Sequence, residues 1–341
     1  MSVLFGGLKA RFDPWSPEYG ASLMSTEESD ALLLMKVAVD TSVEMAEESW
    51  KPVACDPALE PGVSVAFVDG VRRMESNLVF ETDQGFLYGG FGCCGAGAVV
   101  LTPGRMNEME HALKVCSVQR FLFAPEDSGL PETIEIPQAY PSGATMLHQS
   151  IPVSGSEPLE PLRRLQQLMR QEEALVAEQV KVEEASLVVA DGPLSLPLIR
   201  PGIAGFIKSL HSFYIPSSLF PVLTALRKHE RTPIFRLSGE AVMERYSAYV
   251  RINEPRPMDT VLAGLARFEV AGGAGWEEAR AVINRCAALV PLFASPYGRD
   301  PRAPQNLLPI STLEMELRRR LGSPEILNRL YQEALASQEN A

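Results

Sequence analysis

The sequence lacks the residue patterns of several common enzyme classes. It contains only four histidines, and the absence of an HExxH pattern excludes that class of zinc protease. It has no GxSxG segment from which a Ser-His-Asp hydrolase would be built. Its five cysteines are odd in number and have no CxxC spacing, so a disulfide framework or a zinc site is not expected.

Long apolar runs and a signal peptide are also missing. No uninterrupted apolar stretch approaches the roughly 18 residues that a membrane span requires. Residues 1–12 lack the succession of basic, apolar and small residues that marks a signal peptide. Since 46% of the residues are hydrophobic and 22% are charged, the composition is that of an ordinary globular protein. We therefore expect a cytoplasmic protein without a membrane partner.

The chain has no overall excess of basic residues. Its 43 acidic and 31 basic side chains give a net charge of -12, which argues against a nucleic-acid partner because a polyphosphate attracts Lys and Arg. The charge is uneven, however. Residues 1–60 carry eleven acids and four bases, whereas residues 200–256 carry nine bases and four acids. DNA is therefore not excluded, but we expect weak unaided binding and a partner that brings the substrate.

The hydrophobic patterns predict an α/β protein. Strands are predicted at 63–68, 77–81, 86–101, 187–190, 205–210, 234–237 and 246–252, and helices at 162–184, 216–228, 276–289, 312–321 and 325–336. One or two amphipathic helices are predicted within 25–49, and the proline-rich residues 125–161 are predicted to be loop-like. We divide the chain into an acidic helical segment with a linker at 1–60, a central domain at 61–322 and a C-terminal helix at 323–341.

A glycine-rich stretch at 89–95 contains the adjacent Cys93 and Cys94. It has neither the Lys-Ser/Thr ending of a P-loop nor the GxGxxG order of a dinucleotide site. Close backbone packing in a strand or bend is the favoured interpretation, with a phosphate loop as the alternative.

Two buried strands are each followed by an Asp-Gly pair, at Asp69-Gly70 and Asp191-Gly192. Open α/β sheets bind ligands at such strand ends. Converging carboxylates suit Mg²⁺ or Mn²⁺, which prefer oxygen ligands. The alternative, that each Asp-Gly pair only ends its strand in a tight turn, stays open.

The helix before the second of these strands offers a further carboxylate, at Glu172 or Glu173. At about 100° per residue, Glu172 falls near the centre of the apolar stripe and Glu173 falls at its margin. A buried acid needs a partner or a metal ion. The alternative is that both acids belong to a solvated face.

Several segments, taken together, resemble the NurA nuclease family. They are VAFVDG at 65–70, LMRQEE at 168–173, VVADGPL at 188–194 and GFIK at 205–208. RAPQNLLP at 302–309, followed by Leu313-Glu314 and by LRRRLG at 317–322, is similar to the bacterial branch of that family. The resemblance covers roughly residues 60–322.

The resemblance implies an RNase H-like fold, with a mixed central sheet flanked by helices, that binds two Mn²⁺ or Mg²⁺ ions. A strand Asp, a helix Glu and a second-strand Asp hold the metal in the family, and these roles fall on Asp69, Glu173 and Asp191. The family spacing of Arg, Glu and a small residue fits Arg170, Glu173 and Ala177, so we prefer Glu173 over Glu172 for this ligand.

Archaeal members of the family add a C-terminal histidine, and this chain has no histidine after His229. Gln305 or Asn306 is the candidate for that neighbourhood. Lys208 is expected to act at the scissile phosphate as a point cation. The remaining predicted substrate contacts, each with a packed structural role as its alternative, are His211, Tyr214, Tyr249, Arg251 and Arg302.

The resemblance further implies a single-strand endonuclease and 5'-3' exonuclease that acts in DNA end resection and double-strand break repair. Such a nuclease forms a homodimer and docks on a HerA-type hexameric ATPase. Two other classes remain open: a non-catalytic adaptor on an RNase H-like scaffold, and a metal phosphohydrolase of small phosphates.

Overall fold

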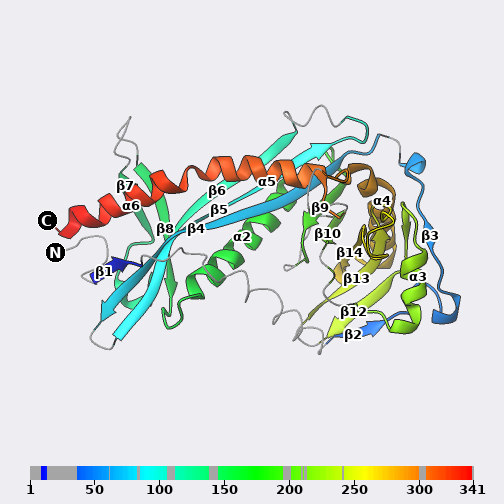
Figure 1. Cartoon of the computed structure of the whole chain (residues 1–341), viewed down its shortest axis with the longest axis horizontal. Coiled ribbons are helices and arrows are strands. Elements are labelled where there is room, and N and C mark those ends of the chain that lie inside the picture. Colours follow the sequence, from blue (N-terminus) through cyan, green and yellow to red (C-terminus); the bar gives the residue numbers. More distant parts are fainter. Residues whose placement is uncertain are drawn as a thin grey trace.

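The structure, a computed structural model, describes residues 9–13, 37–60, 62–82, 85–105, 112–137, 145–194, 201–208, 210, 213–239, 242–298 and 305–339. It is an α/β protein with one large mixed sheet flanked by helices (Figure 1). No helix among these residues is long and apolar enough to cross a membrane.

The strands are β1 (Lys9–Phe12), β2 (Ala38–Asp40), β3 (Val53–Ala54), β4 (Val65–Thr82), β5 (Gly85–Leu101), β6 (Leu113–Pro125), β7 (Thr133–Pro137), β8 (Thr145–Val153), β9 (Leu187–Asp191), β10 (Ile203–Ile207), β11 (Glu230–Arg231), β12 (Phe235–Gly239), β13 (Val242–Arg251) and β14 (Leu265–Ala271). The α-helices are α2 (Glu160–Gln179), α3 (Phe220–Ala225), α4 (Trp276–Leu289), α5 (Leu308–Leu321) and α6 (Pro324–Glu339). Short 3₁₀ turns are η2 (Glu47–Ser49), η3 (Pro57–Leu59), η5 (Glu126–Ser128), η6 (Ser217–Leu219), η7 (Gly272–Ala274) and η8 (Val290–Phe293).

The sheet runs in the order β2-β12-β13-β14-β10-β9-β4-β5-β6-β8-β7. Its centre is the long antiparallel hairpin of β4 and β5, which pair from Val65 and Leu101 to Thr82 and Gly85. On the other side of β4 lies β9, which is parallel to it, and β10 is parallel to β9. This mixed arrangement confirms the α/β prediction.

Helices α2 and α5 cover opposite faces of the hairpin (Figure 1). Cys94 of β5 belongs to the same core cluster as Leu165 of α2, whereas its neighbour Cys93 belongs to the cluster that includes Leu317 of α5. The side chains of successive strand residues point to opposite faces, so this division is the expected one. The glycine-rich stretch is therefore a strand, as favoured, and Gly92 leaves room for Leu165, whose Cδ2 atom lies 3.0 Å from the position that a Cβ would occupy.

Most predicted elements are present, with three corrections. The proline-rich residues 125–161 contain the strands β7 and β8. Residues 38–40 form the strand β2, which pairs with β12, so the predicted helix is wrong there; residues 25–36 lie outside the described part. The strand predicted to end at Asp69 continues to Thr82, because β5 pairs with it over its whole length.

The N-terminal segment is attached to the sheet by a buried ion pair. Both terminal nitrogens of Arg231 donate to the carboxylate of Glu44, at 2.7 and 2.8 Å, and the backbone N–H of Ile234 donates to the same carboxylate at 2.7 Å. Arg231 is almost fully buried. The carboxylate of Glu44 thus joins a guanidinium and a backbone amide in one contact.

The C-terminal helix α6 is anchored by Tyr331. Its ring stacks on Phe91 with centroids 4.2 Å apart, and its hydroxyl lies 3.1 Å from Nε2 of the fully buried His148. The other ring nitrogen, Nδ1, lies 3.2 Å from the carbonyl oxygen of Met146. Because a carbonyl only accepts, Nδ1 carries the proton and Nε2 accepts from the hydroxyl. Burial lowers the pKa of His148 to about 4.

Candidate metal centre

Asp69 and Asp191 meet where two parallel strands separate. The strands β4 and β9 pair only as far as Val68 and Ala190, and β9 ends at Asp191. Asp69 lies one residue beyond the last pair, on β4, close to the end of β9. Asp69 therefore lies inside the long strand β4 but at the end of the pairing between β4 and β9.

A third carboxylate comes from Glu314 on α5. Oxygen atoms of Asp69, Asp191 and Glu314 all lie within 4.8 Å of one another. Helix α5 packs on the sheet through Leu313 and Leu317, and Glu314 is placed between them at the margin of this apolar stripe. The sequence interpretation quoted Glu314 but gave it no role; its position within the stripe is the signal that indicates a buried-facing acid.

Asp69 is the most deeply buried member of this carboxylate cluster. Its side chain is only 5% exposed, Oδ1 accepts the backbone N–H of Gly70 at 2.8 Å, and Oδ2 has no hydrogen-bond partner among the described residues. Burial, followed by the nearby charges of Asp191, Glu173 and Glu314, raises the pKa of Asp69 well above its usual value. A buried oxygen without a partner beside two further acids fits a divalent cation, which would supply the missing positive charge.

Of the two neighbouring helix acids, the structure brings Glu173 to this cluster. Its Oε1 atom lies 2.5 Å from the position that a Cβ at Gly70 would occupy. Burial and the charge of Asp191 raise the pKa of Glu173 to about 8. Glu172 instead accepts a hydrogen bond of 2.9 Å from the hydroxyl of Ser117 on β6. Glu173 is therefore close enough to Asp69 and Asp191 to affect their charges, but it is not one of the three grouped residues, and it is the candidate ligand of a second ion.

We expect Gly70→Ala to displace Glu173 and to weaken Mn²⁺ binding by about tenfold, the range typical for groups that support a metal site. The new Cβ would meet the end of a flexible side chain rather than backbone. The free energy of unfolding should therefore change by less than about 1 kcal/mol. Calorimetric titration with Mn²⁺ and urea unfolding measure the two effects.

Gly273→Ala is the control for that substitution, because no atom lies within 4 Å of a Cβ at Gly273. It should leave both quantities unchanged. Unaltered Mn²⁺ affinity in Gly70→Ala would show that Glu173 does not contribute to the site.

Lys208 joins the cluster from the end of β10. Its Nζ donates to Oδ2 of Asp191 at 2.6 Å, and both side chains are partly exposed, at 20% and 15%. The Lys208 ammonium group thus lies next to the Asp191 carboxylate and offsets part of its charge, while it remains partly exposed to solvent. Its predicted contact with a phosphate stays a prediction.

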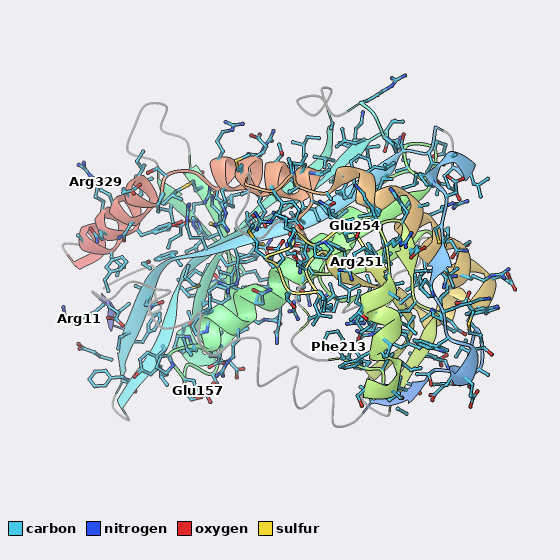
Figure 2. The ribbon with its side chains drawn as sticks, turned by 45° about the vertical axis from the view of Figure 1, so that its right-hand side comes forward. Arg11, Glu157, Phe213, Arg251, Glu254 and Arg329 are labelled. Atoms are coloured by element: carbon cyan, nitrogen blue, oxygen red, sulfur yellow. The ribbon has the colours of Figure 1, made fainter. Side chains whose placement is uncertain are left out.

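Two of the predicted substrate contacts are core residues instead. Tyr249 is fully buried against Phe235, with ring centroids 5.6 Å apart, and its hydroxyl accepts the backbone N–H of Tyr214 at 3.1 Å. Arg251, which is labelled in Figure 2, is 1% exposed and donates to four backbone carbonyls, those of Leu223, Leu226, Val261 and Ala263. Both side chains are therefore covered in this structure, which the alternation along β13 does not reveal.

The other predicted contacts divide into three groups. Tyr214 is half-buried with its ring 4.8 Å from the guanidinium of Arg267, and it remains a candidate for base stacking. Asn306 is fully buried and donates to Ser311 Oγ at 2.7 Å, while Gln305 is half-buried. Two further predicted residues, His211 and Arg302, lie outside the described part of the chain.

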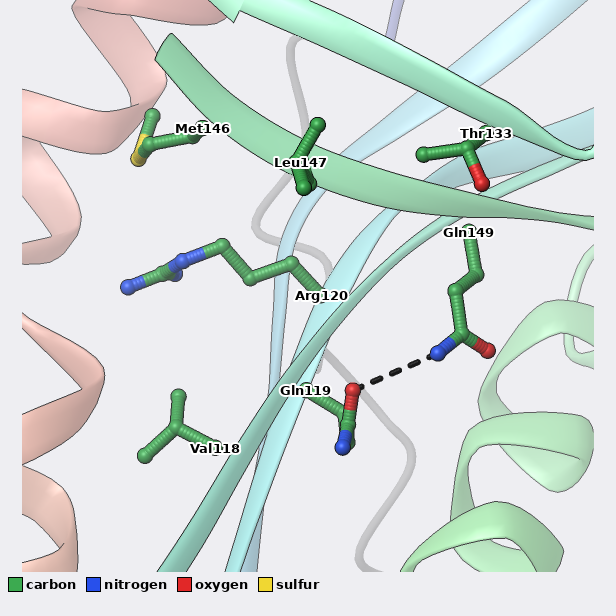
Figure 3. A pocket seen from close by; sticks show the side chains of 7 residues that line it. All are labelled: Val118, Gln119, Arg120, Thr133, Met146, Leu147 and Gln149. Atoms are coloured by element: carbon green, nitrogen blue, oxygen red, sulfur yellow. Dashed lines mark hydrogen bonds between the residues drawn. The ribbon is translucent and has the colours of Figure 1, made fainter. Parts of the chain in front are cut away.

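A separate cavity of about 340 Å³ lies between β6, β7 and β8 (Figure 3). Gln149 on β8 donates to Gln119 on β6 at 3.3 Å, and Arg120 is the charged side chain of the lining. Nη2 of Arg120 donates to the carbonyl of Leu321 at the end of α5. No acid lines this cavity, so it offers no second carboxylate centre.

Comparison with known proteins adds no relative to this picture. No protein-family model matches the chain, and no curated protein matches it either.

Proposed function

We propose that the protein is a metal-dependent DNA nuclease with an RNase H-like core, similar to the NurA nucleases. The observation that carries the proposal is the buried Oδ2 of Asp69, which has no described hydrogen-bond partner and lies in a group with oxygens of Asp191 and Glu314. The order of the central strands supports the RNase H-like assignment, because the antiparallel strands β4, β5 and β6 are followed by β9 and β10, which run parallel to β4.

The carboxylate cluster would hold Mn²⁺ or Mg²⁺ through Asp69, Asp191 and Glu314, with Glu173 beside it for a second ion. When bound, two such ions activate water and stabilise both the attacking and the leaving oxygen of a phosphodiester. In this proposal the C-terminal part of the chain contributes one metal ligand. Glu314 would be that ligand, instead of the earlier candidates Gln305 and Asn306.

The chain's own residues bind and orient the substrate. Lys208 is fixed by Asp191 at 2.6 Å and is 20% exposed, so its remaining hydrogens can meet a phosphate oxygen. In the metal-free protein at pH 7, Glu173 holds a proton, because its pKa is raised to about 8. The half-buried ring of Tyr214, backed by Arg267, would stack on a base of a single strand.

The proposal includes a homodimer and a HerA-type hexameric ATPase that brings the DNA. The acidic total charge supports the need for such a partner, since residues 200–256 carry the basic excess while residues 1–60 are acidic. Sizing chromatography of the protein alone and mixed with a HerA-type hexamer tests both parts. Separate elution at micromolar concentration would remove the motor from the proposal.

The activity is tested with labelled single- and double-stranded DNA and with free nucleotides, each incubated with Mn²⁺ and with or without the motor. Cleavage of DNA that EDTA stops is the expected result. Turnover of nucleotides without cleavage of DNA would favour the small-phosphate hydrolase instead. Neither activity, together with no heat of Mn²⁺ binding, would favour the adaptor.

A further inference from the structure

The chain makes a sharp turn directly after Asp191. Gly192 has φ of 96°, a left-handed conformation that favours glycine, and its N–H donates to the carbonyl of Phe206 at 2.9 Å. Pro193 has no N–H, and the N–H of Leu194 donates to Oε1 of Glu269 at 2.8 Å. Glu269 is therefore the side chain that holds this turn through its backbone.

Glu269 is itself held in a single position. It lies on β14, opposite Gly205 of β10, and is fully buried. Arg245 Nη1 donates to its Oε1 and Arg267 Nη1 to its Oε2, both at 2.8 Å. The two guanidinium groups offset the buried negative charge, and a buried carboxylate with this number of partners has little freedom to rotate.

Gly205 of β10 leaves just enough space for the turn at Gly192 and for the side chain of Glu269. A Cβ at Gly205 would lie 2.8 Å from the carbonyl oxygen of Gly192 and 3.1 Å from Cγ of Glu269. The turn and the carboxylate therefore pack directly on the glycine. Because Phe206, the next residue, pairs with Asp191, a displacement at Gly205 is passed to the end of β9.

We infer that Glu269 is a positioning residue for Asp191, an inference that rests on the proposed function. Glu269 fixes the backbone after Asp191, while Lys208 donates to the Asp191 carboxylate itself. Glu269 is not one of the three grouped carboxylates, and its oxygens accept hydrogen bonds from Leu194, Arg245 and Arg267. Its effect reaches the metal only through the geometry of Asp191.

Direct Mn²⁺ titration of Glu269→Ala and Glu269→Gln tests the inference without relying on cleavage. We expect the Mn²⁺ Kd of Glu269→Ala to rise by about tenfold or more, as for other groups that orient metal ligands. The amide oxygen of Glu269→Gln can still accept from Leu194, so its Kd should rise less. A purely structural role predicts this order for stability against urea but not for the Mn²⁺ Kd.

Glu44→Ala is the matched control, because Glu44 also joins a guanidinium and a backbone amide but lies at the β11 end of the sheet. Both alanine variants should unfold at lower urea concentration, but Glu44→Ala should keep the Mn²⁺ Kd of the unmutated protein. If Glu269→Ala does not fold, Gly205→Ala displaces the same turn without removing a charge and should raise the Kd as well.

Equal Mn²⁺ affinity in the unmutated protein and in the folded Glu269 and Gly205 variants would overturn this inference but not the proposed metal centre. No Mn²⁺ binding by the unmutated protein would overturn the proposed metal centre, and the inference with it. A raised Kd in Glu44→Ala as large as that in Glu269→Ala would also overturn the inference, since it would show a general effect of lost stability.

Discussion

Asp69→Asn is expected to lower the rate of Mn²⁺-dependent DNA cleavage on the order of 10³-fold, the upper range for the loss of one charge-stabilising group. The substitution keeps the shape of the side chain but replaces one oxygen of the carboxylate cluster with an NH₂ group, which cannot bind a cation. Single-turnover cleavage of a labelled single strand at saturating enzyme measures the loss.

The same substitution is expected to raise the melting temperature of the metal-free protein. Asp69 lies beside Asp191 and Glu314, and its burial, followed by the repulsion from these acids, raises its pKa. Asparagine is uncharged, so it removes part of the repulsion among the acids and stabilises the fold, although cleavage is lost. Scanning calorimetry in EDTA compares the two proteins, and Mn²⁺ should then raise the melting temperature of the unmutated protein only.

Glu172→Gln is the control, since its carboxylate bonds to Ser117 rather than facing the carboxylate cluster. It should retain cleavage within a few fold of the unmutated protein. Full cleavage by Asp69→Asn, or a loss in Glu172→Gln that equals it, would contradict the assignment of the site.

Acidification is expected to weaken the fold through His148. Its pKa is about 4 in the folded protein, against about 6.5 for a histidine in an unfolded chain. The stability that comes from keeping the ring neutral is present above pH 6.5 and is lost as the pH falls from 6.5 to 4, because the unfolded chain binds a proton first. The full loss is about 3 kcal/mol.

Urea unfolding of the unmutated protein and of His148→Gln at pH 7.5 and pH 4 isolates this contribution. His148→Gln should be less stable at pH 7.5, because it disturbs the contact with Tyr331, but it should lose about 3 kcal/mol less on acidification. Parallel losses in the two proteins would show that other groups cause the acid sensitivity.

The sequence predicted the local elements well because their signals are local. The apolar runs before Asp69 and Asp191 are buried strands, and the helix between them is α2. The long extension of β4 and the strands β7 and β8 could not be predicted in this way, since pairing with β5 and β6 rather than local preference stabilises them.

The site was predictable only in part. Asp69 and Asp191 follow from where parallel strands end, whereas the choice between Glu172 and Glu173 depends on the space at Gly70, on another element. The apolar stripe of α5 indicates that Glu314 is turned toward the core, but its closeness to Asp69 depends on how α5 crosses the hairpin. Arg251 and Tyr249 carry side chains typical of a binding surface, and only the packing of α3 and its neighbours shows that they are covered.

The origin of Glu314 on α5 also determines when the centre is completed during synthesis. Asp69 and Asp191 are translated well before α5, and domains generally begin to fold from the N-terminal side as the chain emerges. A ribosome-bound chain that ends before residue 308 has the first two acids but not the third. The full carboxylate cluster is therefore assembled only after α5 has left the exit tunnel, so an incomplete chain lacks one of its three acids.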